Sequence, residues 1–305
     1  MAGEGGSDVI AVLGSANMDL MMDVERIPAG GETVHAVRSG RYPGGKGANQ
    51  AVAAARLGES VVFFGKVGRD AFGDLLLNHL RENGVDVQGV ERAESLPTGL
   101  ATVLVDPDGE NAIVCAAGAN GAVDAEYLDR VFDRIAAADV VLLQFEIPLE
   151  TIALLLQRLP TGGPTVIVDP APAKALTSLP LGRIDVLTPN QSELANLTGE
   201  ADIIAGAEVL RARGVRTVIC KAGDRGAYWV GDGVRHVDAL AVEAVDTTAA
   251  GDAFNGALAC AIRARPIEEA IRWANAAGAL AVTRRGAQPS LPDRSDVEEL
   301  LRFHS

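Results

Sequence analysis

Short apolar runs alternate with helical stretches along most of this chain, and the alternation constrains the fold more than any other feature. The apolar runs cover residues 9–13, 61–67, 140–145, 165–168, 185–187 and 217–220, and the helical stretches cover residues 71–83, 125–137, 149–159, 192–197 and 205–212. Strands that are apolar on both sides need cover on both sides, which crossover helices provide in parallel sheets. The sequence therefore predicts an α/β fold with a central, mostly parallel sheet flanked by helices on both faces. Ligands bind beyond the carboxyl ends of the strands in such sheets.

Two segments break the alternation. Residues 28–42 are turn-rich and mixed in polarity, and residues 98–105 and 111–116 predict a β-hairpin across a turn at 106–110. We find no internal repeat, low-complexity tract or flexible linker that would divide the chain. Residues 1–305 are therefore predicted to form one domain with a small β excursion.

The segment from Asp246 to Asp252 precedes an apolar, alanine-rich stretch that is predicted to be a buried helix. The small residues at 249–251 would leave backbone N–H groups bare at the helix start, where the helix dipole adds partial positive charge. Asp252 in the first turn then suggests a carboxylate beside a bound anion. Phosphoryl transfer to a hydroxyl requires such an anion cradle with a base next to it. From these residues alone, an ordinary aspartate at a helix N-terminus explains the pattern equally well.

A second glycine-rich segment, residues 44–51, also precedes an alanine-rich helix, predicted over 51–57. It lacks the GxxxxGK[ST] spacing of a phosphate loop, because no Ser or Thr follows Lys46 to hold magnesium. Its glycines are expected to let backbone approach a small polar ligand, with Lys46 and Asn49 as donors. Upstream, Asn17 and Asp19 alternate along an extended segment, so both can face one side.

Two further polar positions lie where strands end. Glu146 follows the apolar run at 140–145 and is expected at a carboxyl end of the sheet; a solvated loop glutamate is the alternative. Asn190 and Glu193 are three residues apart, so both can point from one helix face toward phosphates and their magnesium shell. The same pair also fits an asparagine cap with a capping-box glutamate, and both roles are compatible.

Composition excludes several functional classes. The net charge of −14 argues against nucleic acid or an anionic membrane as a partner. No segment reaches the roughly 18 apolar residues of a membrane span, and the acidic, glycine-rich residues 1–8 are predicted to be a mobile tail, not a secretion signal. Cys115, Cys220 and Cys260 lie in apolar runs and are predicted to be buried thiols.

These motifs together resemble the PfkB carbohydrate kinase family. The resemblance covers about residues 9–292, with the motifs in family order: Asn-x-Asp at 17–19, GGKGANQA at 44–51, TPNQSE at 188–193, DTTAAGD at 246–252 and TRRGAQPS at 283–290. The Asn-x-Asp and GGKGANQA pair is particular to the ribokinase group of that family. Ala249 stands where many members carry glycine, and alanine is common there in the ribokinase group.

The resemblance implies a cytoplasmic, ATP-dependent kinase that phosphorylates the 5-hydroxyl of D-ribose, with Mg²⁺, a monovalent cation that is usually K⁺, and a homodimer formed through a β-sheet lid at about residues 15–42 and 97–118. The catalytic residues would be Asp252 as general base and an anion hole at Ala249, Ala250 and Gly251. The sugar contacts would be Asn17, Asp19, Gly45, Lys46, Asn49, Glu146 and Asp252. The nucleotide side would comprise Asn190, Glu193, Lys221, Gly223, Gly251 and Asn275. The cation ligands would be Asp246, Thr248, Ala281, Arg284, Gly286 and Ser290.

Three alternatives stay open at the level of sequence. Another sugar or nucleoside kinase of the same family, such as a deoxyribokinase, would differ only in its contacts to the sugar 2-hydroxyl. A non-catalytic sugar sensor is disfavoured because Asp252, Asn190, Glu193 and the cradle are all present. A dinucleotide-dependent dehydrogenase would need G-x-G-x-x-G after the first strand, which residues 14–19 do not supply.

Overall fold

The computed structural model describes residues 9–304, so the tail predicted at 1–8 lies outside the described residues. Within that range the main sheet has nine strands, in the order β13-β12-β11-β10-β9-β8-β1-β4-β5. Their bounds are β1 Val9–Leu13, β4 Ser60–Gly68, β5 Asp86–Ala93, β8 Val140–Gln144, β9 Thr165–Asp169, β10 Val186–Leu187, β11 Thr217–Lys221, β12 Ala227–Val230 and β13 Val234–Val237. The neighbouring strands from β11 to β5 pair in parallel, whereas the pairs β11–β12 and β12–β13 are antiparallel. The predicted mostly parallel sheet is confirmed.

The direction in which the chain winds reverses beside β1. The chain runs from β1 to β4 and β5 on one side, and later enters β8 on the other side before continuing to β9, β10 and β11. A reversal of this kind leaves a crevice beyond the carboxyl ends of the two central strands, which is where open α/β sheets bind ligands. The residues that follow β1 and β8 therefore occupy the expected place for a site.

Helices cover both faces of this sheet, in two separate cores. Along β1 the buried residues alternate, so that Ile10 and Val12 pack into one core and Ala11 and Leu13 into the other. The first core is closed by α1 Lys46–Arg56, α2 Ala71–Glu82, α7 Ala250–Ala261, α8 Ile267–Val282 and α9 Arg294–Phe303. The second is closed by α3 Ala125–Ala136, α4 Leu149–Arg158, α5 Gln191–Thr198 and α6 Ile203–Ala212.

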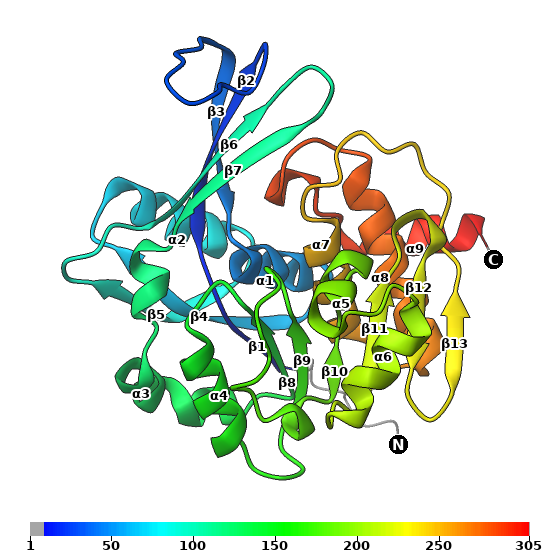
Figure 1. Cartoon of the computed structure of the whole chain (residues 1–305). Helices are drawn as coiled ribbons and strands as arrows, with labels where there is room; N and C mark the ends of the chain where they lie inside the picture. The colour runs from blue at the N-terminus through cyan, green and yellow to red at the C-terminus, as the bar shows by residue number, and fades with distance from the viewer. Residues whose placement is uncertain (1–8, 305) are drawn as a thin grey trace.

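A second, four-stranded sheet stands apart from the main one, at the top of Figure 1. We call this sheet the lid. Its strands, in the order β3-β2-β6-β7, are β2 Asn17–Val24, β3 Ala36–Gly44, β6 Gly99–Val105 and β7 Asn111–Ala116. The hairpin predicted at 98–116 forms between β6 and β7, and β2 joins it in parallel.

Several local predictions were wrong in informative ways. Helix α1 begins at Lys46 and not at residue 51, so it includes Gly47. This glycine lies against the backbone of residues 14–15, where an added Cβ would come within 2.6 Å of an amide nitrogen. Cys115 is exposed on the edge strand β7 and Cys260 is only partly buried, whereas Cys220 is buried as predicted. Among the described residues, no helix combines the length and apolar character needed to cross a membrane.

Candidate active site

The carboxylate of Asp252 lies at the start of α7, next to an unusual turn. Among the described residues, Ala249 is the one residue other than glycine with a positive φ, at 60°. This left-handed residue is the N-cap of α7, and no side chain caps the helix, so its first amides have no side-chain acceptor. Asp252 is 4 % exposed and follows those amides directly. The backbone N–H of Ala250 donates to the Thr247 carbonyl at 3.3 Å. The predicted bare helix start is therefore bare only of side-chain caps, and the carboxylate lies beside it.

Two amides from α1 hold the Asp252 carboxylate. Asn49 Nδ2 donates to Oδ2 at 2.9 Å, and Gln50 Nε2 donates to Oδ1 at 3.1 Å. Burial raises the pKa of Asp252, while the ammonium of Lys46 opposes the rise and the carboxylate of Asp169 adds to it. Burial favours the protonated form, which makes the ionised carboxylate a stronger proton acceptor than a solvated aspartate.

Glu146 lies beyond β8 and accepts hydrogen bonds from the segments that follow β1 and β3. Its Oε2 accepts from Ser15 Oγ, from the backbone N–H of Lys46 at 3.0 Å and from Asn17 Nδ2 at 3.5 Å. Asn17 in turn accepts at Oδ1 from Asn120 Nδ2 at 2.7 Å. The solvated-loop alternative for Glu146 does not hold, because this carboxylate is bound on several sides.

Asp19 shares this crevice with two other carboxylates. Burial, followed by the negative charges of Glu146 and Asp252, raises the pKa of Asp19 to about 7. The paired glycines make the close approach possible: a Cβ at Gly44 would lie 2.1 Å from Asp19 Oδ2, and one at Gly45 would lie 2.7 Å from the Asn17 backbone nitrogen. These glycines were predicted to let backbone approach a ligand. In the structure they leave space for the Asp19 carboxylate and for the backbone at Asn17.

Lys46 supplies positive charge to this acidic crevice. Burial alone would lower its pKa, but the surrounding carboxylates of Asp252, Asp169, Glu146 and Glu193 outweigh burial and raise it. The ammonium therefore stays charged, and it balances carboxylates on both sides of the site.

The residues predicted for the nucleotide side meet at the carboxyl ends of β10 and β11. Asn190 and Glu193 form a complete capping box at the start of α5, with bonds of 2.8 Å in both directions. A β-bridge joins Asn190 to Lys221, and Gly223 follows in a left-handed conformation at φ 62°. The capping-box interpretation of the Asn-x-x-Glu element is thus correct, and it leaves Glu193 one carboxylate oxygen outside the box.

Asn275 lies on α8, apart from that group. Its Nδ2 donates to the carbonyls of Val237 and Asp238 at 3.1 Å each. The side chain therefore anchors the end of β13 and the residue that follows it.

The residues predicted to bind a cation come from two loops that meet beside α7. Asp246 Oδ1 accepts from the backbone N–H of Thr248 at 2.9 Å, and Oδ2 accepts from that of Gly286 at 2.8 Å. Burial would raise the pKa of Asp246, but these bonds lower it below its usual value. Ser290 Oγ donates to the carbonyl of Ala287 at 2.7 Å. Asp246 thus joins residues 246–248 to Gly286 in the 281–290 segment. In that segment the Ala281 carbonyl accepts from the backbone N–H of Arg284 at 3.4 Å.

Sequence reasoning missed several polar residues in this region. Asp169 ends β9 and is 1 % exposed, Gln50 binds two carboxylates, and Gln288 Nε2 donates to Asn49 Oδ1 at 3.0 Å. Asp169 has the same sequence signal as Glu146, because each carboxylate follows an apolar strand and precedes a proline. This signal could have identified Asp169. The side-chain partners of Gln50 and Gln288 are 94 or more residues distant and leave no local signal.

Comparison with known proteins shows the family to which the chain belongs. The model of the pfkB family carbohydrate kinases matches residues 7–294. This chain belongs to that family. Among the family's members, it is 38 % identical to a ribokinase of Haemophilus influenzae over 299 residues, which are 96 % of this chain and 98 % of the relative. It is also 35 % identical to a deoxyribokinase of Salmonella typhimurium, over 97 % of this chain and 99 % of the relative.

Solved structures of pfkB-family kinases share the fold. The ribokinase of Thermotoga maritima superposes with a TM-score of 0.90 at 40 % identity, covering 97 % of this chain and 99 % of the other. The ribokinase of Arabidopsis thaliana, solved in complex with ribose and ATP, superposes with a TM-score of 0.87 at 34 % identity, covering 98 % of this chain and all of the other.

Proposed function

We propose that this pfkB-family enzyme transfers the γ-phosphoryl group of ATP to the 5-hydroxyl of D-ribose and releases D-ribose 5-phosphate. One observation carries the proposal: the buried carboxylate of Asp252 lies in the first turn of α7, which no side chain caps. Asn49, from the segment that would contact the sugar, donates to this carboxylate. A proton acceptor and an anion-binding helix start are thereby adjacent, as phosphoryl transfer to a hydroxyl requires.

The sugar would lie between the main sheet and the lid. Asn17, Asp19, Gly45, Lys46, Asn49 and Glu146 would contact it, together with Asp252. Vicinal hydroxyls need donors and acceptors side by side, and this set supplies amides, an ammonium and carboxylates. Leaving one buried hydroxyl or its partner unpaired costs roughly 1–3 kcal/mol, so the set can discriminate among sugars.

Asp252 would take the proton of the 5-hydroxyl as that oxygen attacks the γ-phosphorus. The amides of Ala249, Ala250 and Gly251 would donate to the oxygens of the transferred group, where negative charge develops. Two features support these roles: the positive φ of Ala249 turns the backbone into the helix start, and no side chain occupies those amides.

ATP would extend from this cradle across the ends of β10 and β11. Lys221 and Gly223 would approach its phosphates, Gly251 would border the cradle and Asn275 would position the wall of the adenine pocket. A carboxylate and polar oxygens at Asn190 and Glu193 fit the water shell of Mg²⁺, which usually keeps several of its waters. Bound Mg²⁺ would neutralise charge on the phosphates.

The oxygens of the 246–248 and 281–290 segments fit a monovalent cation. The candidate donors are Asp246, Thr248, Ala281, Arg284, Gly286 and Ser290, of which only Asp246 carries negative charge. No group of three or more His, Cys, Asp or Glu residues suited to a metal occurs among the described residues. One carboxylate among carbonyls suits a hard monovalent ion such as K⁺ better than a transition metal.

We further propose that residues 1–305 act as one unit, with the lid at about 15–42 and 97–118 closing over the sugar. A second copy of the chain would pack on the lid and form a homodimer. The enzyme would act in the cytoplasm, where ATP is available.

A coupled assay of ADP release over pentoses, deoxypentoses, hexoses and nucleosides tests the function. We expect the highest kcat/KM with D-ribose. Preference for 2-deoxyribose would assign the activity of the Salmonella relative instead, which the 35 % identity keeps as the second candidate. Sugar binding without turnover at saturating Mg-ATP would indicate a sensor and contradict the kinase proposal.

A further inference from the structure

Asp169 is a buried carboxylate that the proposed chemistry does not use. It is the last residue of β9, and its side chain is 2 % exposed. An ionised carboxylate at such depth costs several kcal/mol unless its oxygens are paired. Both are: Oδ1 accepts from Lys221 Nζ at 3.0 Å, and Oδ2 accepts from Gln50 Nε2 at 3.0 Å. Asp169 therefore joins β9 to β11 and to α1.

Gln50 extends this connection to Asp252. Its Nε2 donates to Asp169 Oδ2 and, at 3.1 Å, to Asp252 Oδ1, while its Oε1 accepts from Gln144 Nε2 at 2.7 Å. An amide nitrogen has two hydrogens, and here each has a carboxylate acceptor. The position of Asp252 is thus set partly by Asp169, through one shared amide.

At the other end of the connection, Lys221 lies against the first turn of α7. A Cβ built on Gly251 would be 3.4 Å from Lys221 Nζ. The ammonium that Asp169 holds is therefore beside the amides of the candidate anion hole. One unbroken series of polar contacts leads from this ammonium through Asp169 and Gln50 to the candidate base.

We propose that Asp169 is a positioning residue that holds Lys221 at the transferred phosphate and, through Gln50, holds Asp252 toward the sugar hydroxyl. The inference rests on the proposed function and deepens it. Two groups that must act on opposite sides of the reacting phosphorus would share one rigid support, and a support of this kind sets the near-attack geometry. The buried Lys46 also faces Asp169 and Asp252, so its positive charge helps to balance the two carboxylates.

The competing explanation is a structural ion pair that only ties β9 to β11. Asp169→Asn keeps the shape and removes the charge. We expect it to raise the Kd for Mg-ATP about tenfold and to lower kcat about tenfold or more, since both partners lose their fixed position. The apparent melting temperature should change little relative to these losses.

Two more variants test the Asp169–Lys221 arm and the Gln50–Asp252 arm of this series of contacts separately. Gln50→Met cuts the link to Asp252 but leaves the Asp169–Lys221 pair, so kcat should fall while the Kd for Mg-ATP stays within about twofold. Lys221→Met should raise that Kd. In the double variant Asp169→Asn/Lys221→Met the Kd should match that of Lys221→Met alone, because residues that act through one another are not additive.

The pair Asp185–Arg216 provides a matched control. Asp185 pairs with Arg216 at 3.2 Å and accepts from the backbone N–H of Val166. This pair is more exposed than Asp169–Lys221 and lies at the amino end of the sheet, away from the site. Asp185→Asn should alter the melting temperature and leave the Kd for Mg-ATP and kcat unchanged.

Three results would overturn the proposal. The first is that Asp169→Asn changes the melting temperature but neither kcat nor the Kd for Mg-ATP. The second is that Asp169→Asn and Lys221→Met multiply each other's effects on that Kd, and the third is that Gln50→Met leaves kcat unchanged. Gln50→Met also covers the case in which Asp169→Asn does not fold. Absent turnover in the wild type would refute the proposed function instead, and the nucleotide titrations would still test the Asp169–Lys221 arm.

Discussion

A charged group in a buried site is stabilised by few partners, so single side chains decide much of its behaviour. Asp252 depends on two amides, from Asn49 and Gln50, and is opposed in charge by Lys46. Burial that raises its pKa also keeps water from competing for the proton. Burying the Asp252 carboxylate is unfavourable, and it occurs at the place where the proposed reaction needs a base.

Asp252→Asn should retain the fold and sugar binding but lower kcat by about 10²-fold or more, the range for losing a general base. Single-turnover measurements at saturating ribose and Mg-ATP would isolate the chemical step. Circular dichroism and ribose titration provide the controls. Near-wild-type turnover in a folded variant would remove Asp252 from the base role.

Asp19 predicts a pH dependence of sugar binding. Its pKa of about 7 means that the carboxylate is protonated below pH 7 and ionised above it. The ionised form accepts two or more hydrogen bonds from hydroxyls, whereas the protonated form must donate one. The Kd for ribose without nucleotide should therefore rise as the pH falls, by about tenfold from pH 8 to pH 6.

Asp19→Asn should weaken ribose binding at pH 8 and leave its Kd nearly constant from pH 6 to 8.5, with the Kd for Mg-ATP unaffected. Glu146, Asp252 and Lys46 also face this position. If the pH dependence persists in Asp19→Asn, one of these groups carries it. Equal losses for ribose and nucleotide would make the segment structural.

At the scale of elements, two loops determine whether the start of α7 is fixed. Val245 N–H donates to the Val282 carbonyl at 2.7 Å, and Asp246 accepts from Gly286. The same loop reaches α1 through Gln288, which donates to Asn49. The proposed cation site, the anion hole and the sugar contacts thus belong to one connected unit, and loosening any part would misplace donors in the others.

Activity should therefore rise when potassium is added at constant ionic strength, because a cation among these oxygens would fix the loop that carries the hole. One misplaced donor costs roughly 3 kcal/mol of transition-state stabilisation. Sodium should be less effective, because its smaller radius fits a carbonyl cage poorly. Asp246→Ala should abolish the response. Simple screening would act alike for both ions, so equal rates in matched sodium, potassium and tetramethylammonium buffers would exclude the site.

Elements with a strong local signal were predictable, and those defined by long-range contact were not. The continuous apolar runs at β1, β4 and β8 predicted parallel strands correctly, because burial on both faces leaves no polar alternation. The edge strands β5 and β13 were not predicted, because they are short or mixed in polarity where an edge meets solvent. Strand β12, next to the β13 edge, was not predicted either, because it has only four residues. Cys115 was wrongly predicted to be buried, because the apolar residues next to it lie on the exposed β7 edge of the lid.

The same division holds for the site. Asp252 and Glu146 were predicted because helix starts and strand ends are visible in sequence. Gln50 was not, because its role depends on carboxylates 119 and 202 residues further along the chain.

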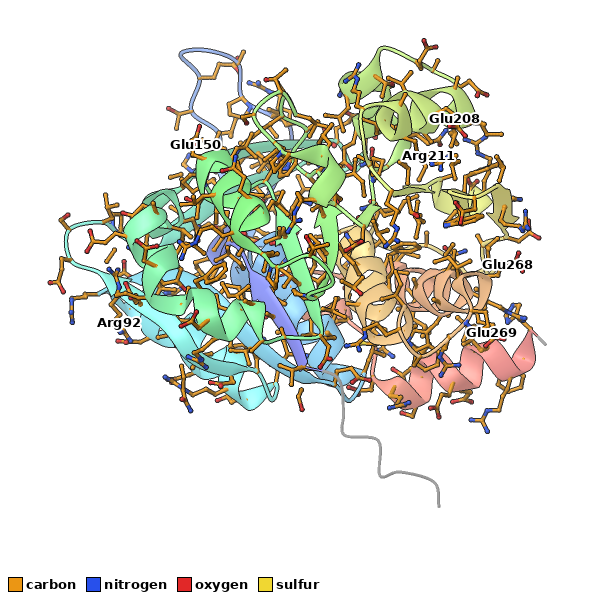
Figure 2. All side chains as sticks on the ribbon, turned by 90° about the horizontal axis from the view of Figure 1, so that it is seen from below. Arg92, Glu150, Glu208, Arg211, Glu268 and Glu269 are labelled. Atoms are coloured by element: carbon orange, nitrogen blue, oxygen red, sulfur yellow. The ribbon has the colours of Figure 1, made fainter. Side chains whose placement is uncertain are left out.

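Across the whole molecule, charge is distributed unevenly between surface and site. Figure 2 shows labelled charged side chains, among them Glu150, Glu208 and Glu268, around the periphery of the ribbon. With a net charge of −14, the protein as a whole repels ATP. The buried Lys46 and the partly buried Lys221, together with the α7 dipole, must outweigh that repulsion locally. Binding of ATP should accordingly tighten with moderate salt before screening weakens the local attraction.

The lid sheet leaves apolar side chains exposed at its edges, which a lone soluble subunit seldom does. Ile113 and Val114 on β7 are 55 % and 72 % exposed, and as neighbours in a strand they point to opposite faces of the lid. A second copy packed across the β7 edge of the lid would cover both side chains. Sedimentation equilibrium should therefore give twice the 31.6 kDa chain mass at micromolar concentration, and Ile113→Lys/Val114→Lys should shift it toward the single-chain mass. Val234→Lys on β13, where the side chain is 42 % exposed, should leave the mass unchanged. Because the lid would also cover the sugar in the proposed complex, the dissociated variant should bind ribose more weakly while its Kd for Mg-ATP stays the same. A wild-type protein that sediments at the single-chain mass under assay conditions would refute the dimer and leave the exposed apolar edge without a partner.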